Sequence, residues 1–171
     1  DVAVIGAGMS GISAAVAAAR QGADVVLIND RPVLGGNASS EIRVTVNGVQ
    51  TLKAKNPVER ETGIIEEILL ENKKYNPQES YPIWDHALYD YVVRQPNLRL
   101  MLNTQAIKAI MDGERIKSAF CWQSTTETEV VINAKIFVDC SGDGLFAATS
   151  GAEYRTGREG KAEFGEKYAP D

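Results

Sequence analysis

The first 28 residues alternate apolar runs with an alanine-rich stretch. Val2 to Ile5 is a continuous apolar run that predicts a buried strand, and Ser10 to Arg20 predicts a helix whose small residues suit close packing on a sheet. Gly22 ends that helix, and Asp24 to Ile28 predicts the next strand. The handedness of such crossovers makes the two strands parallel, so the chain begins with a predicted βαβ unit.

The middle of the chain predicts helices more clearly than strands. Residues 37–62 are mixed and irregular, whereas apolar residues recur at helical spacing over residues 64–69. A second amphipathic helix is predicted for residues 83–94, and a strand for residues 98–102. These elements continue the alternation of helices and strands that is typical of α/β proteins.

The pattern changes to short strands after residue 106. Three of them, the first two joined by the turn Asp112-Gly113, predict an antiparallel meander at 106–111, 115–123 and about 128–132. An apolar strand at 136–138 then breaks into a glycine-rich loop, and a helix follows at about 145–150. The whole pattern predicts an α/β fold: a Rossmann-like, mainly parallel sheet with helices and an inserted antiparallel β-meander.

Composition narrows the classes of partner. The 171 residues include 18 Lys and Arg against 23 Asp and Glu, and this net charge of -5 gives no reason to expect nucleic acid or an anionic membrane surface. No apolar run approaches the roughly 18 residues that cross a bilayer. Cys121 and Cys140 are too few and too isolated for a disulfide scaffold, a thiolate metal site or a redox dithiol. We therefore expect no metal, no nucleic acid and no membrane partner, and the oligomeric state stays open.

The segment from Gly6 to Gly11 is G-x-G-x-x-G, placed between a predicted strand and a predicted helix. In that setting Gly6 permits the tight turn, Gly8 removes the Cβ that would block a pyrophosphate, and Gly11 lets helix and strand pack closely. Free amides around Met9 to Gly11, together with the helix dipole, favour a phosphate. The spacing therefore predicts dinucleotide binding.

A ribose-binding acid is expected at the end of the second strand. Asn29 occupies that position, with Asp30 next to it, so the usual Glu is missing. The Asn29 amide can accept a hydrogen bond from a hydroxyl, and Asp30 can supply a carboxylate after a small shift. Both remain candidates, and a turn into Pro32 is an equally good reason for the Asn-Asp pair.

Four stretches in order resemble the nucleotide-binding part of FAD-dependent oxidoreductases of the glutathione-reductase-like superfamily. They are Val2 to Gly11, Ile28 to the paired glycines Gly35-Gly36, the meander, and Ala134 to Gly144, whose apolar strand ends in D-C-S-G-D-G where the family has D-A-T-G-D-G. After the paired glycines this chain has Asn37-Ala38-Ser39-Ser40 where the disulfide reductases of that superfamily place redox cysteines. The dithiol branch is thereby disfavoured.

The resemblance implies FAD as the cofactor and assigns its contacts residue by residue. The pyrophosphate loop corresponds to Gly6, Gly8, Met9, Ser10 and Gly11, the adenosine ribose end to Asn29, Asp30 and Arg31, and the pyrophosphate and ribityl side to Gly35, Gly36 and Asn37. Ala106 corresponds to the position whose backbone meets adenine, and Ser141, Gly142 and Asp143 to a second loop over the cofactor. For Asp143 we also expect a role as N-cap of the helix near residue 145.

These observations predict the FAD-binding portion of a flavin-dependent oxidoreductase that transfers hydride or electrons on an unidentified small molecule. Alternatives are an NAD(P)-dependent dehydrogenase and a non-catalytic module that binds FAD or ADP.

The chain starts at Asp1 without Met, so the cellular compartment stays open. We expect residues 1–171 to form one FAD-binding domain, inactive alone, with the substrate domain and a later FAD-binding segment outside it. No catalytic residue is assigned, and His86 is expected to be a packed or surface residue. The glycine loops at the two ends of the chain should meet in one crevice.

Overall fold

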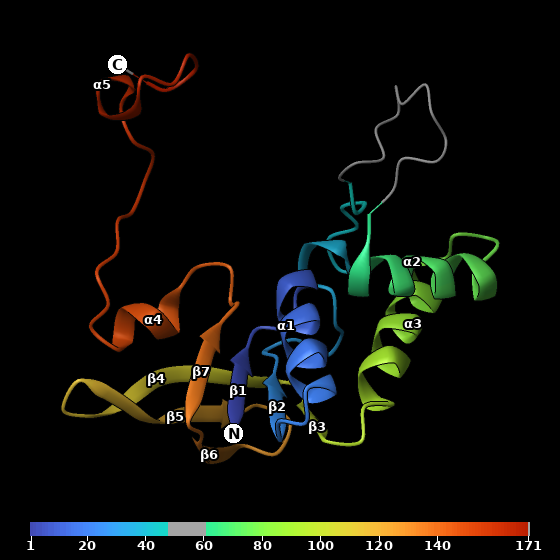
Figure 1. Cartoon of the computed structure of the whole chain (residues 1–171), viewed down its shortest axis with the longest axis horizontal. Helices are drawn as coiled ribbons and strands as arrows, with labels where there is room; N and C mark the ends of the chain where they lie inside the picture. The colour runs from blue at the N-terminus through green and yellow to red at the C-terminus, as the bar shows by residue number, and fades with distance from the viewer. Residues whose placement is uncertain (48–60, 171) are drawn as a thin grey trace.

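The computed structural model describes residues 1–47 and 61–170. Its centre is a parallel sheet of four strands in the order β3-β2-β1-β7 (Figure 1). The strands are β1 (Val2–Ile5), β2 (Val25–Ile28), β3 (Leu98–Met101) and β7 (Ile136–Asp139). In the centre of the sheet, Val2 lies opposite both Val25 and Ile136. The predicted Rossmann-like α/β fold is confirmed.

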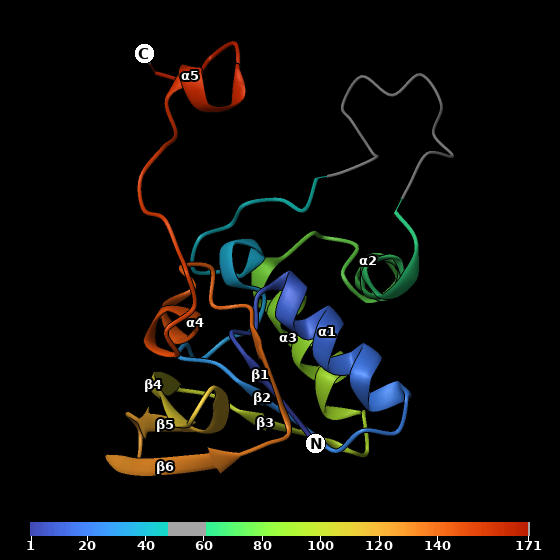
Figure 2. The same cartoon turned by 60° about the vertical axis from the view of Figure 1, so that its left-hand side comes forward.

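Three helices lie on one face of this sheet: α1 (Met9–Arg20), α2 (Gly63–Tyr75) and α3 (Tyr81–Val93). In both views α1 lies along the direction of the strands with α3 next to it, and α2 packs against α1 and α3 (Figures 1 and 2). The alanines of α1 let it approach the strands closely, and Ile12 and Val16 are fully buried against Val4 and Leu27 in the larger of the two cores. The amphipathic periods therefore predicted these helices correctly, to within two residues at each start.

The opposite face of the parallel sheet is covered by the meander. Its strands β4 (Thr104–Asp112), β5 (Arg115–Gln123) and β6 (Thr128–Asn133) pair antiparallel in that order, close to the predicted limits. Ile5 and Ile28 face Ala119 and Cys121 in a second core, together with Phe146 of the short helix α4 (Leu145–Thr149). Burial raises the pKa of the Cys121 thiol to about 11, so this cysteine is a packing residue.

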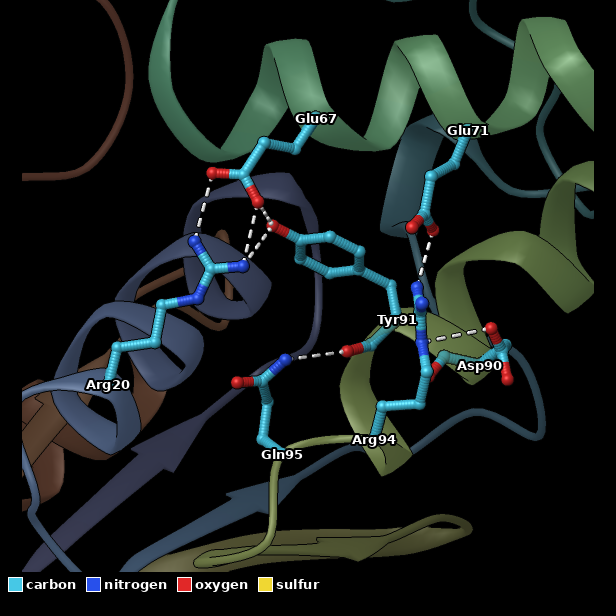
Figure 3. A network of polar contacts seen from close by, with 7 residues as sticks. All are labelled: Arg20, Glu67, Glu71, Asp90, Tyr91, Arg94 and Gln95. Carbon is cyan, nitrogen blue, oxygen red and sulfur yellow. Dashed lines mark hydrogen bonds and ion pairs between the residues drawn. The ribbon is translucent and has the colours of Figure 1, made fainter.

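A polar network ties the three helices together (Figure 3). Arg20 of α1 donates two hydrogen bonds to the Glu67 carboxylate of α2, at 2.9 and 2.7 Å. The Tyr91 hydroxyl of α3 accepts from Arg20 at 2.9 Å and donates to Glu67 at 2.6 Å. Farther along α3, Arg94 bridges to Glu71. The network thus joins α1, α2 and α3 through side chains, and α3 in turn supports a loop of the site described below.

Two further segments complete the described residues. The short 3-10 helix η1 (Gly36–Ala38) follows β2, and residues 48–60 of the predicted irregular stretch lie outside the described part of the chain. After α4 the chain runs away from the sheet to α5 (Lys161–Phe164), which stands apart in both views (Figures 1 and 2). Within residues 1–47 and 61–170, no helix is both long and apolar enough to cross a membrane.

Candidate functional site: a cleft between two glycine loops

The loop between β1 and α1 is held by its first and third glycines. Gly6 has φ +92°, and a Cβ there would lie 2.4 Å from the Cys140 carbonyl oxygen of the neighbouring β7 loop. A Cβ on Gly11 would lie 1.8 Å from the Gly6 carbonyl oxygen. Both positions therefore require glycine for folding, because backbone from elsewhere occupies the space of a side chain.

The second glycine of the motif is under no such constraint. Gly8 has φ -67°, and a Cβ there would meet no protein atom within 4 Å. It forms an isolated parallel bridge with Gly35, whose N-H donates to the Ala7 carbonyl at 2.8 Å. The paired glycines after β2 thus lie directly beside the first glycine loop, and the open side of Gly8 faces solvent space rather than protein.

The loop after β7 is organised by Asp139, the last residue of that strand. Its Oδ1 accepts from the Ser141 N-H at 2.9 Å, and its Oδ2 from the Ala147 N-H of α4 at 2.8 Å. Burial alone would raise the pKa of Asp139, but these hydrogen bonds outweigh it and the pKa is lowered. The expectation that Asp143 caps α4 is wrong: Gly144 is the N-cap residue, and Asp143 is exposed. The Asp139 carboxylate at the end of β7 already accepts a hydrogen bond from the first turn of α4.

Helix α3 supports the paired glycines from behind. The Trp84 indole N-H donates to the Ala38 carbonyl at 2.8 Å, and the Asp85 carboxylate accepts from the Ser40 N-H at 2.9 Å. Leu88 packs so closely that a Cβ on Gly35 would come within 2.8 Å of it. Because Gly35 also has φ +107°, the first of the paired glycines is required by its conformation and by this packing.

These loops enclose one cleft of about 560 Å³, which is within the range of about 300–1,000 Å³ that is usual for small-molecule sites. Its walls are formed by residues 5–10, 28–31, 35–38, 44–47, 104–106, 140–143, 145 and 146. The cleft lies at the carboxyl ends of β1, β2 and β7, where the strand order reverses, which is the usual binding position in open α/β sheets. A second hollow of about 410 Å³ lies between β6 and the first residues of β1 and β2, away from the glycine loops.

All but one of the residues expected from the sequence line this cleft, including Met9, Ser10, Asn37, Ala106 and Gly142. The exception is Gly11, which lies beneath the loop against the Gly6 carbonyl. The expectation that glycine loops from both ends of the chain meet in one crevice is confirmed for Gly6, Gly8 and Gly142.

At the end of β2 three neighbouring residues have different surroundings. Asn29 is buried and its side chain bonds to backbone, whereas Asp30 is exposed at the edge of the cleft. Arg31 donates twice to Glu41, at 2.9 Å each, and this pairing raises the pKa of the guanidinium. The three residues thus offer a ligand different groups, although they are adjacent in sequence.

The sequence did not predict the contribution of residues 44–47 to the cleft wall. They follow Arg43, a non-glycine residue with φ +64° whose carbonyl accepts a hydrogen bond from the Tyr81 hydroxyl at 2.9 Å. The alternating Val44-Thr45-Val46 run is the signal that could have indicated an extended segment there. Thr104, Cys140 and Leu145 also line the cleft and were not named from the sequence, although each lies within two residues of a named candidate.

Two other kinds of site were considered in the sequence: a role for the single histidine and a metal centre. His86 is exposed on α3 and is not part of the cleft wall, in agreement with its expected surface or packing role. In the part of the chain that the structure describes, no cluster of His, Cys, Asp or Glu could hold a metal ion.

The parallel sheet, the glycine loops and the cleft at the strand reversal define a Rossmann-like dinucleotide-binding fold. Residues 1–170 match the family described as FAD dependent oxidoreductase, and the chain belongs to that family. Its cofactor is therefore FAD, which favours the flavin prediction over an NAD(P)-dependent dehydrogenase.

Individual relatives cover different shares of the chain. The cytochrome-type fumarate reductase of Shewanella frigidimarina is 55% identical over 38 residues, which is 22% of this chain and 7% of that protein. The THI4 structure of Thermovibrio ammonificans has TM-score 0.60 at 20% identity and covers 98% of this chain, which spans 63% of it. A geranylgeranyl bacteriochlorophyll reductase-like protein of Thermoplasma acidophilum has TM-score 0.60 at 18% identity, over 90% of this chain and 42% of that one. At these identities the structural matches concern the fold.

Proposed function

We propose that the cleft binds the adenosine diphosphate part of FAD, and that the intact protein is a flavin-dependent oxidoreductase of a small-molecule substrate. The observation that carries the proposal is Gly8: its missing side chain faces the cleft and not the protein, so folding gives no reason for glycine there. A ligand that lies against the backbone supplies that reason. The residues present therefore fit the cofactor of the family.

The electrostatics of the loop suit a diphosphate. The first helical hydrogen bond of α1 runs from the Ile12 N-H to the Gly8 carbonyl, so the preceding amides of Met9, Ser10 and Gly11 have no partner within the helix. The first turn of α1 contains no acidic residue that would compete with a phosphate for these donors. Free amides and the positive end of the helix dipole stabilise an anion by about 0.3–1 kcal/mol per interaction.

The rest of the cleft wall orders the proposed contacts along the cofactor. Asp30 and Ala106 would lie at the adenosine end, and Gly36 and Asn37 beside the pyrophosphate and ribityl chain. Ser141, Gly142 and Asp143 would close the second side. The order follows from the positions of these residues around the glycine loop, and the sequence order of the four motifs supports placement in the glutathione-reductase-like superfamily.

When bound, FAD supplies the hydride or electron transfer, while the protein binds and orients it. We assign the chain's own residues to binding only, and we propose that residues 1–171 act as the nucleotide-binding domain of a longer protein. The lengths of the relatives support this, since the chain spans 63% of the THI4 structure and 7% of the fumarate reductase. The substrate domain and the later FAD-binding segment would lie in the remainder.

Isothermal titration of the purified protein with FAD and with ADP tests the binding site. Gly8→Val should weaken both ligands at least tenfold, about 1.4 kcal/mol or more, because its side chain fills cleft space. Gly160→Val is the matched control: Gly160 is also an N-cap residue with negative φ and has no protein atom within 3.4 Å of a Cβ. Equal affinities of Gly8→Val and the parent would contradict the proposal.

Turnover needs its own test. Anaerobic addition of candidate electron donors to the flavin-loaded intact protein should bleach the flavin absorbance bands. Full occupancy by FAD without reduction by any donor, chemical dithionite excepted, would instead support a non-catalytic binding module.

A further inference from the structure

Asn29 occupies the position where dinucleotide-binding folds usually place the ribose-binding acid, directly after β2. Its side chain is 6% exposed, although the residue borders the cleft. A buried polar side chain must satisfy its hydrogen-bonding groups within the protein or from a ligand. The contacts of the Asn29 amide therefore decide whether a ribose hydroxyl can use it.

Both halves of the amide are already engaged by backbone. The Oδ1 accepts from the Ala7 N-H at 3.2 Å, and the Nδ2 donates to the Val33 carbonyl at 2.8 Å and to the Arg31 carbonyl at 3.2 Å. A primary amide has two N-H donors, so none is left for a ligand. An aspartate at this position would present carboxylate oxygens to two carbonyl oxygens, which explains why an amide stands here.

The contacts of Asn29 link the two halves of the site. Ala7 lies between the first two glycines of the phosphate loop, and its carbonyl accepts from the Gly35 N-H at 2.8 Å. The backbone of Asn29 itself is fixed, because its N-H donates to Met101 and its carbonyl accepts from Thr104, both at 2.8 Å. Asn29 thus connects the phosphate loop, and through Ala7 also Gly35, to the end of β3 and the start of β4.

The next two side chains, Arg31 and Asp30, differ in whether they are free to bind a ligand. Arg31 is bound by both oxygens of Glu41. Asp30 is exposed, borders the cleft, and its carboxylate takes no hydrogen bond from the residues that the structure describes. The Asn29 Oδ1 keeps a second lone pair, but that residue is only 6% exposed, whereas Asp30 presents its acceptors at the surface of the cleft, where a ribose diol can reach them.

We propose that Asn29 is a positioning residue that holds the phosphate loop, and that recognition of the adenosine ribose is moved one residue along the chain to Asp30. The inference rests on the proposed function, since it assumes that an ADP group enters this cleft. It separates two tasks, loop support and hydroxyl recognition, that the two adjacent residues would otherwise share.

Titration calorimetry with ADP and 2′-deoxy-ADP tests the proposal, because the ratio of the two affinities reports the contact to the hydroxyl. Asn29→Ala should weaken both nucleotides by the same factor, at least about tenfold, and leave the ratio at the parent value. Asp30→Ala, which removes the acceptor, should lower the affinity for ADP and bring the ratio close to one. Asn133→Ala and Asp112→Ala, both exposed and outside the cleft, are the matched controls and should change neither.

Stability measurements keep the test informative if Asn29→Ala does not fold. Asn29→Asp then serves as second variant, with the same expected result: equal weakening of both nucleotides and a lower Tm. A collapse of the ratio in either Asn29 variant, a parent ratio retained by Asp30→Ala, or an unchanged Tm and affinity in both Asn29 variants would overturn the inference. If the parent binds neither ADP nor FAD, the proposed function fails, whereas the support role of Asn29 is still judged by Tm.

Discussion

The Tyr91 hydroxyl allows a quantitative test of how the helices are held over the sheet (Figure 3). Tyr91→Phe removes one hydrogen bond to the Glu67 carboxylate, at 2.6 Å, and one from the Arg20 guanidinium, at 2.9 Å. Hydrogen bonds to charged groups contribute about 1.5–3 kcal/mol when buried. The Arg20 and Glu67 side chains are 39% and 46% exposed and still bind each other in the variant, so solvent screens the loss. We expect a loss of about 1–2 kcal/mol in the free energy of unfolding.

The same network fixes the pH dependence of that loss. The hydrogen bonds from Arg20, and then from Tyr91, lower the pKa of Glu67 from 4.5 to about 2. A carboxylate whose pKa is lower in the folded state contributes its full stabilisation above its unfolded pKa and loses it as the pH falls toward the folded value. The difference between Tyr91→Phe and the parent should therefore shrink as the pH falls from about 4.5 toward 2.

Urea unfolding followed by circular dichroism, at neutral pH and again at about pH 3, measures this difference. Tyr89→Phe is the matched control, because Tyr89 lies on the same helix with 44% of its surface exposed. The control should stay within about 0.5 kcal/mol of the parent. If Tyr91→Phe were as stable as Tyr89→Phe at neutral pH, or kept its full deficit at acid pH, the reasoning would be refuted.

Three further substitutions probe the loops of the site. Gly6→Ala places a Cβ 2.4 Å from the Cys140 carbonyl oxygen at φ +92°, so thermal melting should show a loss above about 2 kcal/mol, and an unchanged Tm would argue against the close approach. Asp139→Asn weakens the contact to the Ala147 amide, and urea titration at neutral pH should show a loss of about 1 kcal/mol in the free energy of unfolding. Because the pKa of Asp139 is lowered in the folded state, the stabilities of parent and variant should converge as the pH falls. Trp84→Phe leaves a backbone carbonyl of η1 without its indole donor, and urea unfolding should show a loss of about 1–3 kcal/mol, whereas no loss would mean that water replaces the indole.

Much of the fold could be predicted because its signals are local. A few neighbouring residues are enough to predict the strand Val2 to Ile5, the helix α1 and the glycine that follows it. Each of them has the predicted structure. The glycine motif was equally informative, since the positive φ of Gly6 and the close contact of Gly11 with the Gly6 carbonyl arise within one turn. Of the residues inferred from that spacing, Gly6, Gly8, Met9 and Ser10 line the cleft, and Gly11 lies beneath the loop.

The parts that could not be predicted depend on partners distant in sequence. Asp143 looked like a cap because it lies two residues before α4 begins, whereas the carboxylate that binds the Ala147 amide belongs to Asp139, eight residues before it at the end of β7. The role of residues 44–47 in the cleft wall depends on the left-handed conformation of Arg43 and on Tyr81 of α3. Neither arrangement leaves a periodic pattern in the sequence, because each is set by tertiary packing.

The bridge between Gly8 and Gly35 has a consequence for how the protein is loaded. The bridge, and the hydrogen bonds of Asn29, join the two loops through protein atoms, so binding of the nucleotide would lose less free energy on ordering them. The bound nucleotide would then add stability to loops that the protein itself already holds together.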